Sequence, residues 1–334
     1  MKRPLRSISI LGDGGWGTTP AIHLGHRGYK VLLWGAFAAN VAAMTRAREN
    51  KKFLPGHKLP SSIRLSADMG EAIEFADLVV LACPSEYLRN VLQKIEKTSC
   101  RGKAFLSVIK GIDPQTFQRM SQVIHEHLGK VPLAVLSGPT IAGETAGGMA
   151  TTAVAASTDK ALARAIQKVF NSPSFRIYTN TDVAGVELGG SIKNVIAIAC
   201  GVCDGLGLGT NAKSAILTRG LSEITRLGVA LGGRKETFYG LAGLGDLATT
   251  CFSPSSRNRT VGEALGKGKS VRTVLGNMHM VAEGVVTAKA VYRLSRKRRI
   301  PMPITEQVYK IIFEAKNPRK AMADLMGRQV KAEN

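Results

Sequence analysis

The sequence is poor in cysteine, and it has few features of secreted or membrane proteins. Five cysteines among 334 residues form no disulfide framework. No apolar run reaches membrane-spanning length, and the basic start of the chain leads directly into an apolar segment rather than a secretory one. We therefore expect a cytoplasmic protein without a membrane span.

Candidate metal ligands are equally scarce. Cys200 and Cys203 form one C-x-x-C pair, but no second pair or nearby histidine completes a site. The pair lies in an apolar helical stretch, which favours two small buried residues one turn apart. His125 and His127 would point their rings apart on a helix. The sequence therefore predicts no metal site.

Acidic residues are also few, with 24 against 46 lysines and arginines and a net charge of +22. Such an excess raises the question of nucleic acid binding. The basic residues are scattered, however, and the densest group, Arg296–Arg299, falls at the end of a predicted helix without interleaved aromatic residues. We expect no specific nucleic-acid partner, and most of the charge is left without an explanation.

Short apolar strands alternate with helical segments over the first half of the chain. Strands are expected at 7–11, 30–34, 76–83, 104–108, 133–136 and 150–156. This alternation predicts a mostly parallel sheet with helices on both faces. From about Asp182 long helical periods take over, so we expect a second, all-α domain. The expected α/β chain divides into domains at 1–185 and 186–334.

The first predicted strand leads into a G-x-G-x-x-G motif formed by Gly12, Gly14 and Gly17. Gly12 permits a tight turn, Gly14 lets phosphates approach the backbone, and Gly17 lets helix and strand pack closely. The following helix N-terminus supplies unpaired N–H groups to an anion. The motif therefore predicts a Rossmann-type, doubly wound domain that binds a dinucleotide, although a structural turn is the alternative.

Two polar segments follow later strands of the predicted sheet. Lys110 comes after one strand, at the sheet edge where ligands bind in such folds. Gly138 and Thr140 form a tight turn after the next strand, where free N–H groups and a hydroxyl suit a phosphate or carbonyl oxygen. An ordinary loop lysine and a plain turn are the alternatives.

Lys193 is predicted to lie on a helix face of small residues. Gly189 and Gly190 are neighbours of Lys193 on that face, which leaves room for a ligand beside the amine. A glycine inside a helix costs about 1 kcal/mol relative to alanine, so a compensating use is expected. The alternative is a solvated lysine beside a close helix contact.

A further glycine-rich stretch, 240–245, precedes Asp246, which is placed to bond an amine or hydroxyl. Ser256, Arg257 and Asn258 stand where another helix should begin. Hydroxyl, guanidinium and amide donors at a helix start are the groups that bind phosphate. A capped helix with exposed arginines is the alternative.

With these motifs in this order, the chain resembles the bacterial NAD(P)-dependent glycerol-3-phosphate dehydrogenases from about Ile8 to Gly327. The resemblance is most specific at 185–199, 204–209, 218–220, 240–246 and 255–259. It implies reversible hydride transfer between NADH or NADPH and dihydroxyacetone phosphate, giving sn-glycerol 3-phosphate for phospholipid synthesis. It also implies a homodimer.

The resemblance implies residue roles as well. Lys193 would be the general acid and base, protonating the forming alkoxide in reduction and accepting that proton in oxidation. The implied substrate-binding residues are Lys110, Gly138, Thr140, Lys193, Asp246, Ser256, Arg257 and Asn258. The implied cofactor-binding residues are Gly12, Gly14, Gly15, Trp16, Gly17, Lys110, Ala142, Arg257, Val281 and Glu283.

The chain departs from this family where the cofactor should bind. Asp13 and Gly15 replace the usual Ala and Ser, so a negative charge is expected beside the pyrophosphate unless Asp13 points away. Gly35 and Ala36, after the second strand, offer neither a basic partner for a 2′-phosphate nor an acidic partner for the ribose. The choice between NADH and NADPH is therefore open. Pro20 is expected in the first helical turn, where proline is tolerated.

Two other functions fit parts of the sequence. One is a related two-domain reductase acting on another small hydroxy acid, against which the segment 256–258 and the intact surroundings of Lys193 argue. The other is a non-catalytic relative that binds nucleic acid, which the net charge and the altered glycine motif favour. All the proposed catalytic positions are present, which argues against it.

Overall fold

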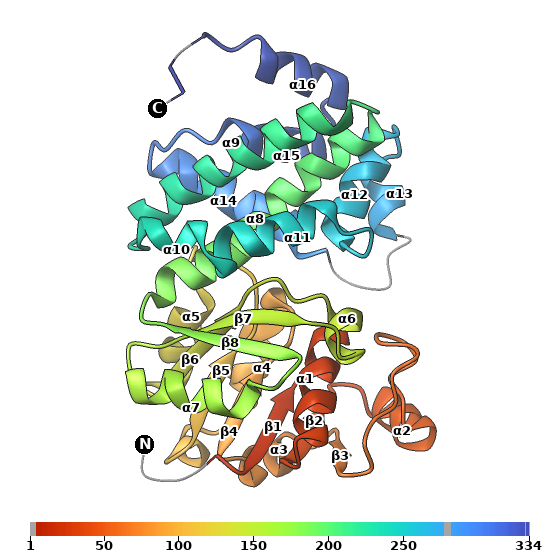
Figure 1. Cartoon of the computed structure of the whole chain (residues 1–334), viewed down its shortest axis with the longest axis vertical. Helices are drawn as coiled ribbons and strands as arrows, with labels where there is room; N and C mark the ends of the chain where they lie inside the picture. Colours follow the sequence, from red (N-terminus) through yellow and green to blue (C-terminus); the bar gives the residue numbers. More distant parts are fainter. Residues whose placement is uncertain (1–4, 277–281, 331, 334) are drawn as a thin grey trace.

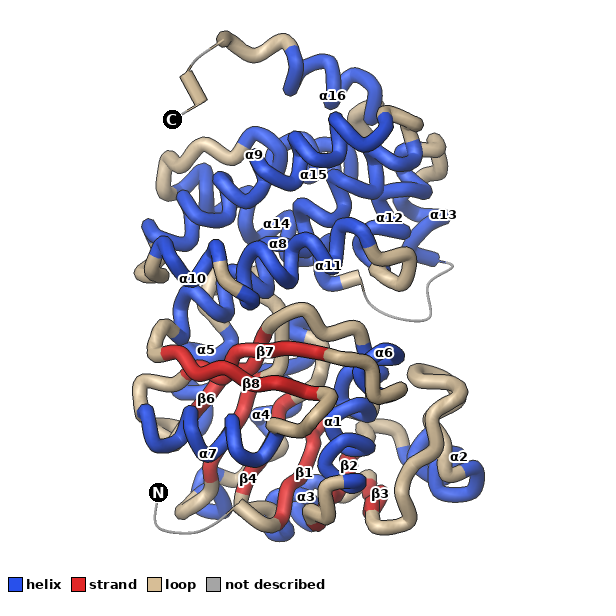
Figure 2. The backbone as a smooth tube through the Cα atoms, in the orientation of Figure 1, coloured by secondary structure: helices blue, strands red, loops and turns tan. Residues whose placement is uncertain are grey.

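The computed structural model describes residues 5–276, 282–330 and 332–333, in which a sheet-containing part is followed by a helical part. Figure 1 shows the two parts stacked along the long axis of the molecule. Figure 2 shows the strands confined to the part that begins at the N-terminus. The predicted α/β class with a helical second half is therefore confirmed.

Eight strands form one sheet in the order β3-β2-β1-β4-β5-β6-β7-β8. All neighbours are parallel except β6 and β7, which run antiparallel. The strands are β1 (Ser7–Leu11), β2 (Lys30–Trp34), β3 (Ile63–Ser66), β4 (Leu78–Leu81), β5 (Ala104–Ser107), β6 (Leu133–Ser137), β7 (Thr151–Ala156) and β8 (Phe175–Asn180).

Helices cover both faces of this sheet because its central strands bury apolar side chains on both sides. Alternate residues of β4 enter different cores, with Leu78 and Val80 on one face and Val79 and Leu81 on the other. One face packs against α1 (Gly15–His26), α2 (Ala38–Ala47), α6 (Ala142–Ala146) and α7 (Lys160–Phe170). The other packs against α3 (Met69–Phe75), α4 (Leu88–Gln93) and α5 (Met120–Leu128), with 3₁₀ turns at Ser85–Tyr87 and Lys97–Cys100.

The sequence did not predict β3 and β8, the two edge strands. In β8, buried Phe175 and Ile177 alternate with exposed Arg176 and Tyr178, so its period-two signal is present but short. Pro20 was also misplaced. It is the sixth residue of α1, beyond the first turn, where a backbone N–H would normally bond to the carbonyl of residue 16.

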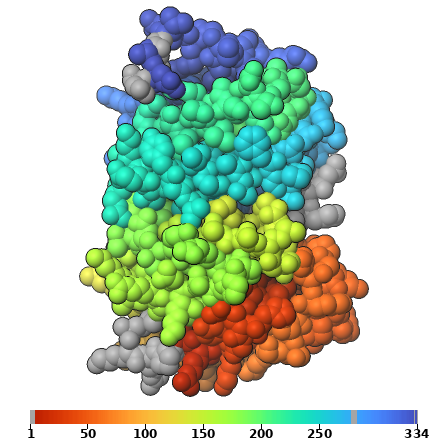
Figure 3. Space-filling view, in the orientation of Figure 1, coloured from red at the N-terminus to blue at the C-terminus, as the bar shows by residue number. Residues whose placement is uncertain are grey.

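The helical part is built around α8 (Val183–Gly205), which is buried from Gly185 to Cys203. Its other helices are α9 (Gly209–Ala230), α10 (Lys235–Tyr239), a π-helical turn (Leu241–Gly245), α11 (Asp246–Phe252), α12 (Arg257–Gly266), α13 (Val271–Gly276), α14 (Glu283–Lys297), α15 (Pro303–Phe313) and α16 (Pro318–Met326). Figure 3 shows this part seated directly on the sheet-containing part.

Contrary to the sequence expectation, α8 is long and apolar enough to cross a membrane. Its most apolar stretch is completely enclosed by the rest of the protein, as in the core helix of a folded domain. Cys200 and Cys203 lie in this buried stretch, and all five cysteines of the chain are free and buried. The interpretation of the C-x-x-C pair as packing residues therefore agrees with the structure.

The sheet and helical parts are joined by buried polar and apolar contacts. Glu187 of α8 accepts hydrogen bonds from Arg119 Nη1 at 2.6 Å and from the backbone and hydroxyl of Ser121 at 2.7 and 2.6 Å. Beside it, Val186 and Ala242 pack with apolar side chains of β6 and β7. These contacts fix the start of α8 against the carboxyl edge of the sheet.

Candidate active site

The glycine turn after β1 has the shape expected for a pyrophosphate site. Gly12 has a φ of +130°, and a Cβ there would lie 2.7 Å from the carbonyl carbon of Ala82. A Cβ on Gly17 would lie 1.8 Å from the carbonyl oxygen of Gly12, so both positions require glycine. A Cβ on Gly14 would meet nothing within 4 Å, so the backbone is open to a ligand where α1 begins. The turn therefore fits a dinucleotide phosphate.

Side chains from distant segments hold this turn. Asn50, which is fully buried, donates to the carbonyl of Asp13 at 2.6 Å and to Thr18 Oγ1 at 2.8 Å. Thr19 Oγ1 donates to the carbonyl of Ala142 at 3.0 Å, so Ala142 lies beside the turn. Trp16 Nε1 is buried without a hydrogen-bond partner among the described atoms. Asn50 could not be predicted from the sequence, because nothing in the motif indicates a support 37 residues away.

The carboxylate of Asp13 points away from the turn. Its Oδ2 accepts a hydrogen bond from Asn40 Nδ2 at 2.5 Å, and a Cβ on Gly35 would lie 2.7 Å from the same oxygen. The negative charge therefore lies beside the end of β2.

A second group of residues gathers around the Lys193 amine. Lys193 is 5% exposed on α8, and its Nζ forms an ion pair with Asp246 Oδ1. The same Nζ donates to Thr250 Oγ1 at 2.5 Å. Thr250 follows Asp246 by one helical turn on α11. This i, i+4 spacing is a signal that could have identified Thr250 from the sequence.

Lys110 reaches the same carboxylate from the sheet. Its Nζ donates to Asp246 Oδ2 at 2.7 Å, to the carbonyl of Gly138 at 3.0 Å and to Thr140 Oγ1 at 3.3 Å. Asp246 is 1% exposed, so each of its oxygens binds one lysine out of contact with water. The structure thus brings together five of the residues to which the resemblance gave substrate roles.

The electrostatics of this cluster affect the proton affinity of Lys193. Burial lowers the pKa of Lys193 from 10.5 to about 8, and the charge of Lys110 acts in the same direction. The carboxylate of Asp246 raises the pKa and so limits the decrease. An amine with a pKa near the working pH can both give and take a proton, which suits a general acid and base.

The two glycines before Lys193 serve a close helix contact, which was the alternative to the room for a ligand that the sequence predicted. A Cβ on Gly190 would lie 2.3 Å from Ser137 Oγ, and a Cβ on Gly189 would lie 2.6 Å from the carbonyl oxygen of Ala242. The absence of these Cβ atoms lets α8 approach both the end of β6 and the π-helical turn. This close approach places Lys193 next to Lys110.

The segment 256–258 begins α12, as predicted. Ser256 caps the helix by accepting a hydrogen bond from the backbone N–H of Arg259 at 3.3 Å. Asn258 donates to Asn194 Oδ1 at 2.9 Å and accepts from the backbone N–H of Gly284 at 2.9 Å. The amide of Asn258 therefore ties α12 to the residue that follows Lys193 and to the start of α14.

Arg257 and Glu283 lie near the same cluster. Burial raises the pKa of Glu283, while the charges of Arg257, Lys110 and Lys193 oppose the increase. These interactions place a fourth and a fifth charged group close to the two lysines and Asp246. Val281, another predicted cofactor residue, lies outside the described residues.

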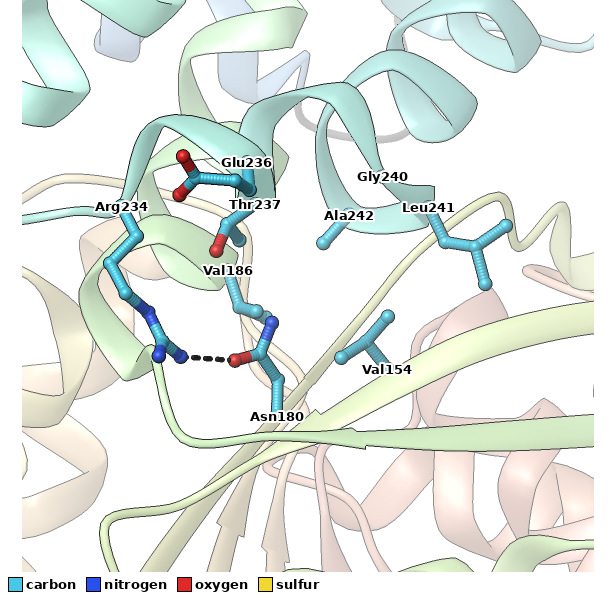
Figure 4. Close-up of a pocket in the computed structure, with 9 residues that line it drawn as sticks. All are labelled: Val154, Asn180, Val186, Arg234, Glu236, Thr237, Gly240, Leu241 and Ala242. Carbon is cyan, nitrogen blue, oxygen red and sulfur yellow. Dashed lines mark hydrogen bonds between the residues drawn. The ribbon is translucent and has the colours of Figure 1, made fainter.

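A cavity of about 350 Å³ lies elsewhere, between β7, β8 and α10. Figure 4 shows its lining, with Arg234 bonded to Asn180 at one side. The lining residues are Val154, Asn180, Val186, Arg234, Glu236, Thr237, Gly240, Leu241 and Ala242, none of them a predicted site residue. Among the described residues no three metal-binding side chains gather. The buried charges therefore favour the Lys193 cluster as the candidate active site.

Both parts of the chain are similar to known proteins. Residues 7–163 match the family model of the NAD-dependent glycerol-3-phosphate dehydrogenase N-terminus, and residues 182–323 match that of the C-terminus. The chain is 48% identical to glycerol-3-phosphate dehydrogenase [NAD(P)+] of Chlorobium limicola, with 98% of this chain and 99% of the relative covered. Identity to the Geobacter sulfurreducens enzyme is 47%, with 98% of each covered.

A solved structure shows the same fold over nearly the whole chain. The glycerol-3-phosphate dehydrogenase of Coxiella burnetii superposes with a TM-score of 0.92 at 35% sequence identity. The match covers 97% of this chain and 99% of the other.

Proposed function

The chain belongs to the NAD-dependent glycerol-3-phosphate dehydrogenase family, and we propose that Lys193 is its acid and base in the reversible reduction of dihydroxyacetone phosphate to sn-glycerol 3-phosphate. It is an oxidoreductase that uses NAD or NADP. The observation that carries the proposal is the buried Lys193 amine between Asp246 and Thr250.

The glycine turn would hold the cofactor pyrophosphate through the backbone of Gly12, Gly14 and Gly15 at the start of α1. Trp16, Gly17 and Ala142 would complete this cradle, and the proposal also includes Lys110, Arg257, Val281 and Glu283 as cofactor contacts. When bound, the nicotinamide supplies the hydride in reduction and accepts it in oxidation.

Lys193 would protonate the oxygen on carbon 2 of the substrate as negative charge develops there. In the reverse direction its neutral amine would take the hydroxyl proton from the same oxygen. Burial supports this role, because it lowers the pKa of Lys193 to about 8 and makes both protonation states accessible. Lys110 and Asp246 would orient the amine, and their charges would adjust its pKa.

The substrate phosphate would bind at the start of α12. Arg257 would contribute charge, and the helix N-terminus would contribute backbone N–H groups. Ser256 uses its oxygen as an acceptor in capping, so its hydroxyl hydrogen remains to be donated. Asn258 would position this segment relative to Lys193 through its bond to Asn194, and Gly138 and Thr140 would border the substrate beside Lys110.

The proposal includes a homodimer in the cytoplasm that supplies glycerol phosphate for phospholipid synthesis. The rival functions are less well supported. Neither a reductase of another hydroxy acid nor a nucleic-acid-binding relative accounts for full-length similarity to these dehydrogenases together with two lysines on one buried carboxylate.

The test is oxidation of NADH and of NADPH by the purified protein with dihydroxyacetone phosphate, at several salt concentrations. We expect turnover by the wild type and a loss of about 100-fold or more in Lys193→Ala, because general acid catalysis is removed. Cofactor binding and thermal stability are measured on the same variant.

Lys213→Ala is the matched control. Lys213, on α9, is also a buried lysine in an ion pair, but its carboxylate partner is Asp204, at 2.8 Å, rather than Asp246. Its loss should leave turnover close to that of the wild type. Full turnover in Lys193→Ala would remove Lys193 from the mechanism, and a folded wild type without turnover would refute the reaction.

A further inference from the structure

Asp13 is a buried charge that the geometry of the glycine turn does not require. It is 8% exposed, and its backbone carbonyl, rather than its carboxylate, receives the bond from Asn50 that supports the turn. Aspartate is rarely buried without a partner. No ion pair joins Asp13 to a basic side chain in the part of the chain that the structure describes.

The carboxylate occupies the space beside the end of β2. Strands β1 and β2 are adjacent and parallel, with Leu11 opposite Trp34, so the residues after them lie at the same sheet edge. Gly35 follows β2 directly, and a Cβ there would lie 2.7 Å from Asp13 Oδ2 and 2.9 Å from Asp13 Cγ. Asp13 therefore stands where a side chain at position 35 would begin.

That position selects the cofactor in Rossmann-type domains. An acidic side chain near the end of the second strand bonds the adenosine ribose hydroxyl of NAD, whereas a nearby arginine accommodates the 2′-phosphate of NADP. This chain has glycine at that place, and no acidic residue follows until Glu49. Arg48 directs its guanidinium to the backbone carbonyls of Pro60 and Ile63.

We propose that Asp13, oriented by Asn40, replaces the missing acidic residue of β2 and makes the protein select NADH over NADPH. The inference rests on the proposed function, because it assumes that a nicotinamide dinucleotide binds at the glycine turn. The carboxylate has acceptor capacity left beyond the Asn40 bond, so it can accept hydrogen bonds from ribose hydroxyl groups. The same buried negative charge opposes a phosphate at the 2′ position.

The experiment measures dissociation constants of NADH and NADPH by fluorescence titration, without substrate. The proteins are the wild type, Asp13→Asn, Asp13→Ala and the control Glu74→Gln. Glu74 is an exposed acid on α3, so its replacement changes the net charge equally while leaving the β2 edge intact. Thermal unfolding shows which variants fold, and the alanine variant is used for the comparison if the asparagine variant does not fold.

We expect the wild type to bind NADH at least about tenfold more tightly than NADPH. NADPH loses the charge-assisted hydrogen bond between the ribose hydroxyl and Asp13, and its 2′-phosphate is repelled by the same carboxylate. In the Asp13 variants this ratio should fall by about tenfold or more, and Glu74→Gln should keep the wild-type ratio.

A wild type that prefers NADPH, or a folded Asp13 variant that keeps the wild-type ratio, would overturn the assignment. A wild type that binds neither nucleotide would overturn the proposed function and this inference together. Turnover is measured separately with dihydroxyacetone phosphate. Selective NADH binding that is lost in the Asp13 variants supports the assignment even if turnover is absent, and absent turnover then counts against the reaction alone.

Discussion

Replacement of Asp246 by asparagine should shift the pH dependence of the enzyme in a defined direction. Asp246 is 1% exposed and contacts the amine of Lys193, which is 5% exposed. Its carboxylate opposes the effect of burial on the pKa of Lys193, which still lies near 8. Asp246→Asn keeps the shape of the side chain and removes the charge, so burial and the charge of Lys110 then lower the pKa of Lys193 further.

The size of the shift follows from this contact. An opposite charge this close favours the charged form of its partner by about 1 to 3 pKa units, or about 1.4 to 4 kcal/mol. The pKa of Lys193 should therefore fall from about 8 into the range of about 5 to 7. At neutral pH at least about half of the amine would then be unprotonated.

The rate of reduction and the rate of oxidation depend on pH in opposite ways. Reduction needs protonated Lys193, so its rate should fall as the pH rises through the pKa of that amine, and this limb should move to lower pH in Asp246→Asn. Oxidation needs the neutral amine, so its rising limb should also move to lower pH. At neutral pH the variant should lose reduction more than oxidation, whereas general damage to the site would lower both rates.

The assay follows kcat in both directions between about pH 4.5 and 10, with saturating substrates. Thr250→Val is the matched control, because it removes a hydrogen bond to the same amine and leaves the Asp246 charge in place. In Thr250→Val the limb of the pH profile should move by less than about one pH unit. A limb that stays at the wild-type position in Asp246→Asn, or moves upward, would refute the reasoning.

Three further outcomes are expected. Arg257→Ala should raise the KM for dihydroxyacetone phosphate about 10- to 100-fold by loss of a charge-assisted contact, and an unaltered KM would contradict a phosphate role. Gly190→Ala should lower unfolding stability by about 1 to 3 kcal/mol in urea, because its Cβ would lie 2.3 Å from Ser137 Oγ; equal stability would contradict the tight contact. Burial raises the pKa of Glu223, which accepts hydrogen bonds at the start of α15, from 4.5 to about 7. The stabilisation that Glu223 contributes is complete below pH 4.5 and is lost as the pH rises through 7. The free energy of unfolding of the wild type should therefore fall by about 3 kcal/mol over that range, and Glu223→Gln should abolish this fall. Thermal unfolding across the same pH range measures the difference.

Features encoded by neighbouring residues were predictable from the sequence. The central strands, the glycine turn at Gly12–Gly17 and the start of α12 all follow from short motifs. The small residues around Lys193 were expected to leave room for a ligand, whereas the structure places Ser137 and Ala242 against Gly190 and Gly189. The edge strands β3 and β8 were missed because they are only partly buried, which weakens their apolar pattern.

Features that depend on long-range packing were not predictable. Asp246 binds Lys193 and Lys110 across sequence separations of 53 and 136 residues, and no local pattern specifies which of the many lysines will meet it. The direction of the Asp13 side chain depends on Asn40, which belongs to another element. The sequence could place both residues near a ligand, but only the packed structure relates their charges to particular partners.

The division of two lysines between the sheet and the helical part has a consequence for incompletely assembled chains. Lys110 follows a strand of the sheet, whereas Lys193 and Asp246 belong to helices. The glycine turn is built within the sheet-containing part. A chain with only that part in place would keep the glycine turn and leave the proton donor unformed. Turnover thus reports the integrity of the entire polypeptide, and a folded first half alone cannot supply it.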